Sequence, residues 1–137
     1  MKKYVLDACA LIALLNREDG GESVREIIEQ AKIGSSEVYM SIVNLFEVYY
    51  GMLRIYDEEV AESLILMVEA SPIKVIATIT REVLKEAGRL KVAYKMSVAD
   101  SIAVAEASVS NGILVTSDHH ELDAVEASEN TKFYWFR

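Results

Sequence analysis

Four acidic residues of this chain lie where a carboxylate is costly to a folded protein unless something pairs with it. Asp7 and Asp118 each follow a short apolar run, while Glu47 and Asp100 lie among the apolar residues of predicted helices. They are far apart in the sequence, so only the folded chain can bring them together. Carboxylates that meet repel one another and need a cation, and an all-oxygen site suits Mg²⁺ or Mn²⁺. The four residues therefore predict a divalent-metal site.

Three of these acids also have a purely structural explanation. Asp7 directly precedes a predicted helix, where its side chain could accept a backbone N–H as an N-cap. Asp118 and Glu121 have the spacing of a capping box, and Ser97 and Asp100 have the same spacing. Taken one at a time, these three acids are compatible with helix starts alone.

Glu47 cannot be a cap, because it lies in the middle of the predicted helix IVNLFEVYYGML. Nearly every position around that helix is apolar, which predicts burial on most sides. The polar stripe is narrow and consists of Asn44, Glu47, Gly51 and Arg54. An ion pair with Arg54 is the alternative to a functional role for Glu47. Gly51 costs about 1 kcal/mol of helix stability relative to alanine, so we expect a close backbone approach there.

Apolar strands and amphipathic helices alternate along the chain, which indicates a parallel sheet covered by helices on both faces. Strands are expected over 3–7, 38–42, 73–77, 113–117 and 133–136. Helices are expected over 8–16, 22–33, 42–55, 58–69, 80–94 and 98–110, with a short one from 119. Ser41 is expected to cap the helix over 42–55.

This arrangement gathers the acids at one side of the sheet. Asp7 and Asp118 end strands at the carboxyl edge, where open α/β sheets bind their ligands. The helix that contains Asp100 must start near that edge to lead back into the strand over 113–117. Glu47 lies near the start of the helix that follows the strand over 38–42. All four acids are therefore expected around one crevice.

Composition limits the function classes. The chain has 137 residues, of which 52% are hydrophobic and 26% charged, as expected for one compact domain over 1–137. Its net charge of −8 argues against a module that binds nucleic acid through a broad basic surface, but not against an enzyme that contacts nucleic acid locally. The single cysteine, Cys9, excludes an internal disulfide and a cysteine-based zinc site, and its apolar neighbours favour a packing role over that of a nucleophile.

We expect no membrane association and a cytoplasmic location. No window approaches the roughly 18 unbroken apolar residues of a membrane span. The first fifteen residues, MKKYVLDACALIALL, begin with basic residues, but an aspartate interrupts the apolar stretch and no signal-type cleavage site follows.

A cluster of basic residues precedes Asp100. Five of the fourteen basic residues fall in one predicted helix and the loop after it: Arg81, Lys85, Arg89, Lys91 and Lys95. The first three form an i, i+4 row. This row is either a phosphate-binding strip or a solvated face that Glu82 and Glu86 balance.

The sequence resembles the PIN-domain nucleases. YVLDACALIALL, SIVNLFEVYYG, SVADSIAVAEA and ILVTSDHHEL are similar in order and spacing to the four motifs of that family. The size of the chain and the VYYG element most resemble the VapC-type ribonuclease toxins of toxin–antitoxin pairs. The resemblance implies a three-layer α/β/α fold with a mostly parallel sheet of four or five strands in the order 3-2-1-4-5.

The resemblance also implies roles for individual residues. The catalytic, metal-binding residues would be Asp7, Glu47, Asp100 and Asp118, with Mg²⁺ or Mn²⁺ as the cofactor. Thr116 and Ser117 match the hydroxyl-bearing positions beside the last acid, and Asn44 lies where it could orient the carboxylate of Glu47. His119 and His120 are expected in the solvated first turn of a helix rather than as ligands.

The expected function is metal-dependent hydrolysis of RNA phosphodiester bonds by the toxin of a VapBC-type pair. The resemblance implies a homodimer and an antitoxin protein whose tail covers the site. A magnesium-dependent phosphatase of the haloacid dehalogenase type is one alternative, although it needs a second aspartate where Cys9 stands. The other alternative is a catalytically silent binding module that keeps the acidic site.

Overall fold

A five-stranded parallel sheet organises the molecule. The computed structural model describes residues 1–137, and its strands pair in the order β3-β2-β1-β4-β5, as expected. The strands are β1 (Lys2–Leu6), β2 (Ser36–Ser41), β3 (Ile73–Ile76), β4 (Ile113–Thr116) and β5 (Lys132–Trp135). Every pairing is parallel. The chain order reverses between β1 and β4, which creates a crevice at their carboxyl ends.

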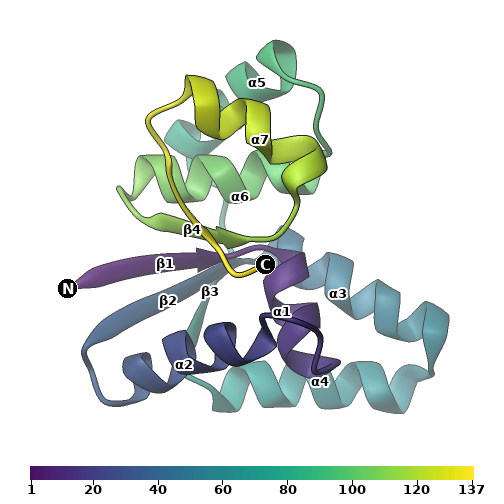
Figure 1. Ribbon diagram of the computed structural model, residues 1–137. Helices are drawn as coiled ribbons and strands as arrows, with labels where there is room; N and C mark the ends of the chain where they lie inside the picture. Colours follow the sequence, from purple (N-terminus) through teal and green to yellow (C-terminus); the bar gives the residue numbers. More distant parts are fainter.

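Seven helices cover the sheet on both faces, so the fold has the three expected α/β/α layers (Figure 1). They are α1 (Ala8–Leu15), α2 (Gly21–Lys32), α3 (Ile42–Ile55), α4 (Glu58–Ala70), α5 (Arg81–Ala93), α6 (Val98–Val109) and α7 (His119–Ser128). Each expected bound lies within two residues of the observed one. None of the helices has both the length and the apolar character that crossing a lipid bilayer requires.

The molecule has two hydrophobic cores, one on each face of the sheet. They are separate because successive side chains of a strand point in opposite directions. On β1, Tyr4 and Leu6 pack with α1 to α4, whereas Val5 packs with α5, α6 and α7. Burial on both faces explains the continuous apolar sequence of β1. It also fixes the register of β1 and thereby the position of Asp7, the first residue after the strand.

Side-chain caps set where six of the seven helices begin. In each case an oxygen accepts a backbone N–H of the first turn; the caps are Asp7, Ser41, Asp57, Thr80, Ser97 and Asp118. The expectation that Ser41 caps α3 is confirmed. Asp7 directly follows β1, Ser41 is the last residue of β2, and Asp118 lies two residues after β4. The same local chemistry that starts these helices therefore places polar groups at the carboxyl edge.

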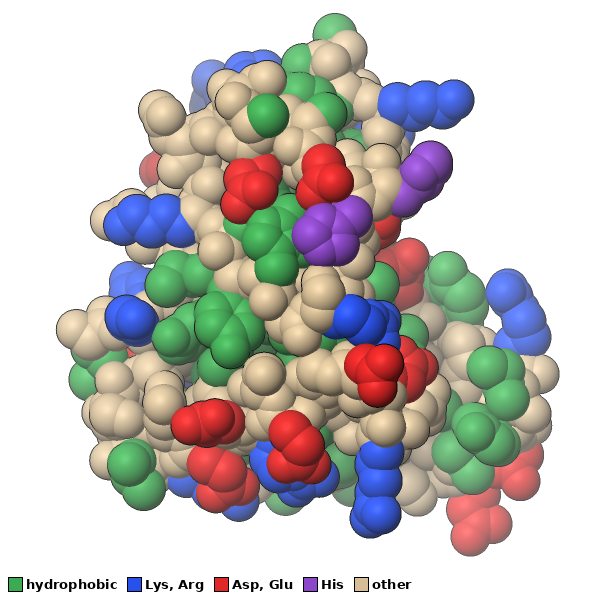
Figure 2. Space-filling view, in the orientation of Figure 1, with side chains coloured by type: hydrophobic (Ala, Val, Ile, Leu, Met, Phe, Trp, Pro, Cys, Tyr) green, Lys and Arg blue, Asp and Glu red, His purple; other side chains and the backbone are tan.

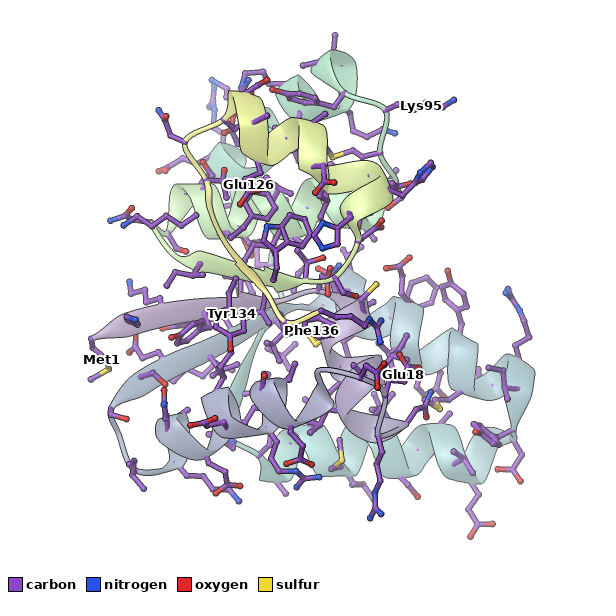
Figure 3. The ribbon with its side chains drawn as sticks, viewed as in Figure 1. Met1, Glu18, Lys95, Glu126, Tyr134 and Phe136 are labelled. Carbon is purple, nitrogen blue, oxygen red and sulfur yellow. The ribbon has the colours of Figure 1, made fainter.

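The end of the chain is tied to the turn between α1 and α2. The guanidinium of Arg137 donates to Glu18 Oε1 at 3.3 Å and to the Asp19 carbonyl at 3.1 Å, and Figure 3 shows Glu18 beside the segment that follows β5. Gly20 has a φ of +83°, and a Cβ at this position would overlap the carbonyl of Phe136. Only glycine meets both requirements without strain.

The expectation that α3 is buried on most sides is wrong. Its buried residues, Asn44, Leu45, Val48 and Met52, lie along one side of the helix. Phe46 is 60% exposed and Ile55 is 70% exposed. Gly51 has open space around it, since a Cβ would meet nothing within 4 Å, so the expected close backbone approach is also absent.

Candidate metal centre at the carboxyl edge of the sheet

Asp7 is buried with half of its carboxylate unpaired. Oδ1 accepts the N–H of Ala10 at 2.9 Å, whereas Oδ2 is buried and has no hydrogen-bond partner. Burial raises the pKa of Asp7 to about 6, the hydrogen bond from Ala10 opposes this rise, and repulsion from Asp118 and Glu47 adds to it. An unpaired buried oxygen is destabilising. The N-cap role therefore explains only one of the two oxygens of Asp7.

Asp100 is also buried, in the first turn of α6. Its N–H donates to Ser97 Oγ at 3.1 Å, which is half of a capping box. In the other half, the carboxylate of Asp100 would accept the N–H of Ser97. That N–H instead donates to Oε2 of Glu121, in α7, at 3.2 Å. The carboxylate of Asp100 is therefore left free for another partner.

A hydrogen bond links the carboxyl groups of Asp100 and Glu121. Burial, followed by this hydrogen bond, raises the pKa of Asp100, while the same bond lowers the pKa of Glu121. The pair therefore holds a proton on Asp100 when no cation is present. A cation that bound there would replace that proton.

Asp118 completes a cluster of three carboxylates. Its N–H donates to Thr116 Oγ1 at 3.1 Å, and its Oδ1 accepts the N–H of Glu121 at 3.2 Å. Asp100, Asp118 and Glu121 each offer one oxygen, and these oxygens all lie within 4.8 Å of one another. Thr116 is the last residue of β4 and is fully buried. Because its hydroxyl accepts the N–H of Asp118, it fixes the backbone just after the strand.

Glu121 was interpreted only as a capping-box residue in the sequence. The backbone half of that box forms, but the carboxylate points across to Ser97 and Asp100 instead of back to Asp118 N–H. The signal that could have identified it is its spacing: Glu121 lies three residues after Asp118 and therefore on the same face of α7.

Glu47 faces the same site from α3. Burial and repulsion from Glu121 raise its pKa. A hollow of about 300 Å³ is lined by four carboxylates, those of Glu47, Asp100, Asp118 and Glu121. The other lining residues are Ala8, Cys9, Ile12, Tyr50 and Ser97. Asp7 is not a lining residue itself, but it immediately precedes two that are.

The ion-pair alternative for Glu47 is wrong. Arg54 makes no ion pair; its guanidinium lies over the ring of Tyr50, 5.4 Å from the centroid. The role expected for Asn44 is also wrong. Its amide donates to the carbonyl of Ala99 at 3.2 Å, and its Oδ1 is buried without a partner. Asn44 thus joins α3 to the start of α6 rather than orienting Glu47.

Cys9 lies on the wall of the hollow and against the core. Burial, followed by repulsion from the four predicted acids, raises its pKa to about 12. A thiol with this pKa stays protonated at neutral pH and is a poor nucleophile. This agrees with the packing role expected for it.

The residues that flank Asp118 are held by the end of the chain. Ser117 Oγ accepts a hydrogen bond from Arg137 at 3.2 Å. His119 Nε2 lies 2.9 Å from the carbonyl of Arg137 and its Nδ1 lies 2.8 Å from Asp123 Oδ1. The ring of His119 also stacks on Trp135, with centroids 3.9 Å apart. His119 and His120 are both exposed in the first turn of α7, as expected, and the ring nitrogens of His119 contact Asp123 and Arg137 rather than the acidic hollow.

The basic row on α5 is partly neutralised. Arg89 pairs with Glu86 at 2.8 Å and with Glu129 at 2.6 Å. These contacts favour the solvated-face interpretation for Arg89 and leave Arg81 and Lys85 as the members of the row without an ion pair.

A parallel sheet in this strand order, with acids gathered at its carboxyl edge, is the arrangement that the sequence motifs implied. The family model of the PIN domain matches residues 4–127. The chain therefore belongs to the PIN domain family. A comparison with curated proteins finds no match.

Solved structures share the fold. VapBC from Salmonella typhimurium, in a DNA-bound crystal structure, matches with a TM-score of 0.74 and 15% identity over 100% of both chains. VapBC2 from Rickettsia felis, bound to a DNA fragment from its promoter, matches with a TM-score of 0.73 and 17% identity over 96% of this chain and 97% of that one. Mycobacterium tuberculosis VapC20, a sarcin-ricin loop cleaving toxin, matches with a TM-score of 0.63 and 15% identity over 81% and 86%.

Proposed function

We propose that this protein is a divalent-metal-dependent endoribonuclease, the toxin of a VapBC-type toxin–antitoxin pair. The observation that carries the proposal is the cluster of Asp100, Asp118 and Glu121, with carboxylate oxygens within 4.8 Å of one another beside the unpaired Oδ2 of Asp7. Membership of the PIN domain family supports a nuclease, and the VapBC structures that share the fold support a toxin with a protein antitoxin.

The donor set fits Mg²⁺ or Mn²⁺. Both ions prefer oxygen ligands, and Asp100, Asp118 and Glu121 offer only carboxylate oxygens. Cys9 stays a neutral thiol, which argues against a softer metal. The residues that would hold the ion are these three acids, with Asp7 and Glu47 completing the negative charge around it.

The reaction would be the attack of water on phosphorus, with cleavage of one phosphorus–oxygen ester bond and transfer of a proton to the leaving oxygen. A bound Mg²⁺ or Mn²⁺ would lower the pKa of its water and offset charge on the phosphate oxygens. Glu47 lines the hollow, and its raised pKa suits it to accept a proton from the attacking water. Asp7 would act indirectly. Its hydrogen bond with Ala10 holds the start of α1 at the end of β1, next to the other acids.

The proposal also specifies an RNA substrate and a protein partner. VapC20, which shares this fold, cleaves the sarcin-ricin loop, and this supports RNA as the target. Exposed apolar side chains on α3 and α4 offer a surface for a homodimer or for the antitoxin: Leu53, Ile55, Tyr56, Val60, Leu66 and Met67.

A nuclease assay tests the proposal. The chain is incubated with Mn²⁺ and a panel of RNAs, with duplex DNA and with a phosphate monoester. We expect cleavage of RNA that stops with EDTA and in Asp7→Asn. Hydrolysis of the monoester alone would favour the phosphatase alternative. No hydrolysis of any substrate, by a protein that still binds Mn²⁺, would favour the silent binding module.

A further inference from the structure

Two aromatic side chains and a guanidinium form a row along α3, in which Phe46 and Arg54 are exposed and Tyr50 is partly buried. Phe46, Tyr50 and Arg54 are spaced at i, i+4 and i+8, so they lie on one face of the helix. The rings of Phe46 and Tyr50 meet edge to face with centroids 5.1 Å apart, and Arg54 lies over the Tyr50 ring. None of the three belongs to either core. The contacts of Tyr50 with Phe46 and Arg54 orient the row, and Phe46 and Arg54 remain exposed.

The row meets the acidic hollow at its middle residue, Tyr50. Tyr50 lines the hollow together with Glu47, three residues earlier on the same helix, and Phe46 lies one turn before Tyr50. Figure 2 shows hydrophobic and basic side chains together over the outer part of α3, at the right of the view. A molecule that reaches the carboxylates from this side therefore passes over the ring of Tyr50, which Phe46 and Arg54 flank.

Electrostatics alone gives a polyanion little reason to bind here. The chain has a net charge of −8, and the hollow itself is acidic. Arg89 is already paired with two glutamates. Binding must therefore use contacts that do not depend on a basic surface. Aromatic faces provide such contacts because they stack with nucleobases of any sequence, and an arginine beside them can contact phosphate or stack as well.

We propose that Phe46, Tyr50 and Arg54 form a stacking platform for unpaired nucleotides next to the scissile phosphodiester. The platform rests on the proposed ribonuclease function and names the residues of α3 that would hold an unpaired strand beside the acidic hollow. A duplex hides the faces of its bases within the stack, so only unpaired bases can reach the rings.

A second copy of this chain is the competing occupant, because Ile42 and Leu53 are exposed on the same helix. Two features favour RNA over a second copy. The row is continuous with the hollow through Tyr50, and it ends in Arg54, whose charge is complementary to phosphate and has no carboxylate partner in this chain.

The test measures binding separately from cleavage. A single-stranded RNA that contains 2-aminopurine is titrated in Ca²⁺, with the RNA shown to stay intact on a gel, and stacking is detected as fluorescence quenching. We expect Phe46→Leu to weaken binding on the order of tenfold and Phe46→Trp to restore it. Leu53→Ala is the matched control on the same helix and should bind as the wild type does. A duplex of the same sequence should bind weakly to all of them.

Cleavage kinetics then separate the platform from the metal site. In Phe46→Leu we expect KM for the single strand to rise while kcat changes little. Wild-type affinity and quenching in Phe46→Leu would overturn the platform, and would leave the ribonuclease proposal intact if Asp7→Asn still abolishes cleavage. A Phe46→Leu variant that loses only self-association, measured by sedimentation, would assign the row to an interface between copies. Failure of the wild type to cleave any RNA with Mn²⁺ would instead contradict the proposed function.

Discussion

The backbone N–H of Ser97 donates a hydrogen bond to Oε2 of Glu121 at 3.2 Å, and this contact joins the starts of α6 and α7. Within a capping box, Asp100 would have accepted that N–H. Because an acid from another helix takes its place, the carboxylate of Asp100 is free to meet Asp118 and Glu121. The cap that starts α6 and the candidate metal centre are thus parts of one arrangement.

Glu121→Gln tests whether Glu121 belongs to the metal centre. The amide oxygen can still accept the N–H of Ser97, so the fold should be retained. One negative charge is lost, and we expect the affinity for Mn²⁺, measured by calorimetry, to fall by about 10- to 100-fold. Glu22→Gln, on the exposed start of α2, is the charge-matched control. Unchanged Mn²⁺ affinity in Glu121→Gln would leave the residue with a capping role only.

Asp7→Asn tests the buried acid. We expect RNA cleavage to fall at least about 100-fold, because the variant removes negative charge and an oxygen that lacks any other partner. The melting temperature in EDTA at pH 8 should not fall, since the buried charge of the wild type is itself destabilising there. Wild-type cleavage by a folded Asp7→Asn protein would contradict the assignment.

The metal-free protein should lose stability as the pH rises. The folded-state pKa of Asp7 is about 6, above the ordinary aspartate value of 3.8, so between these values the folded state binds more protons than the unfolded state. The free energy of unfolding therefore falls with rising pH in this window, by about 3 kcal/mol for Asp7 alone. The raised pKa of Asp100 extends the fall to higher pH.

Thermal unfolding in EDTA from pH 4 to pH 9 measures this trend. Saturating Mn²⁺ should weaken or reverse it, because the cation replaces the protons on the carboxylates. In Asp7→Asn the fall below about pH 6 should be smaller by the contribution of Asp7, while the contribution of Asp100 remains. A melting temperature that rises steadily with pH in EDTA would show that the acids are not held together as described.

Asn44→Ala tests the link between α3 and α6. In this variant the buried carbonyl of Ala99 loses the hydrogen bond that the Asn44 amide donates. We therefore expect the free energy of unfolding to fall by about 1–3 kcal/mol. Since Ala99 immediately precedes Asp100, Mn²⁺ affinity should fall as well. Chemical denaturation and calorimetry measure the two effects; a variant with wild-type stability would rule out the link.

Gly51→Ala should stabilise the protein. A Cβ at Gly51 meets nothing within 4 Å, and alanine is favoured over glycine inside a helix by about 1 kcal/mol. Gly20→Ala is the opposite case, because the positive φ and the overlap with Phe136 both oppose a side chain. Denaturant midpoints should move in opposite directions for the two variants, and a destabilised Gly51→Ala would mean that the helix is packed more closely than described.

The sequence predicted best what local chemistry decides. Asp7 and Asp118 follow strands whose apolar residues are continuous; alanine and leucine, strong helix formers, follow Asp7, and Asp118 has the spacing of a capping box with Glu121, so each position at the carboxyl edge could be inferred from its neighbours. The strand order came from the family resemblance. The clustering of Asp100 with Asp118 followed from the same topology, because a helix that returns to β4 must begin near that edge.

Tertiary contacts were predicted less well. Glu121 was overlooked because a capping box already explained it, and its contact with Ser97 crosses between helices. Asn44 was assigned to Glu47, its neighbour on the helix, but its partner Ala99 is far away in the sequence. The composition of α3 predicted burial that does not occur at Phe46, since an apolar side chain on a surface helix gives no indication of which partner covers it.

Anomalous scattering from a crystal soaked in Mn²⁺ tests the central claim most directly. We predict an anomalous peak in the hollow lined by Glu47, Asp100, Asp118 and Glu121, about 2 Å from oxygens of at least two of these carboxylates, and no such peak in Asp100→Asn. An empty hollow at saturating Mn²⁺, or a peak that persists unchanged in Asp100→Asn, would contradict the account.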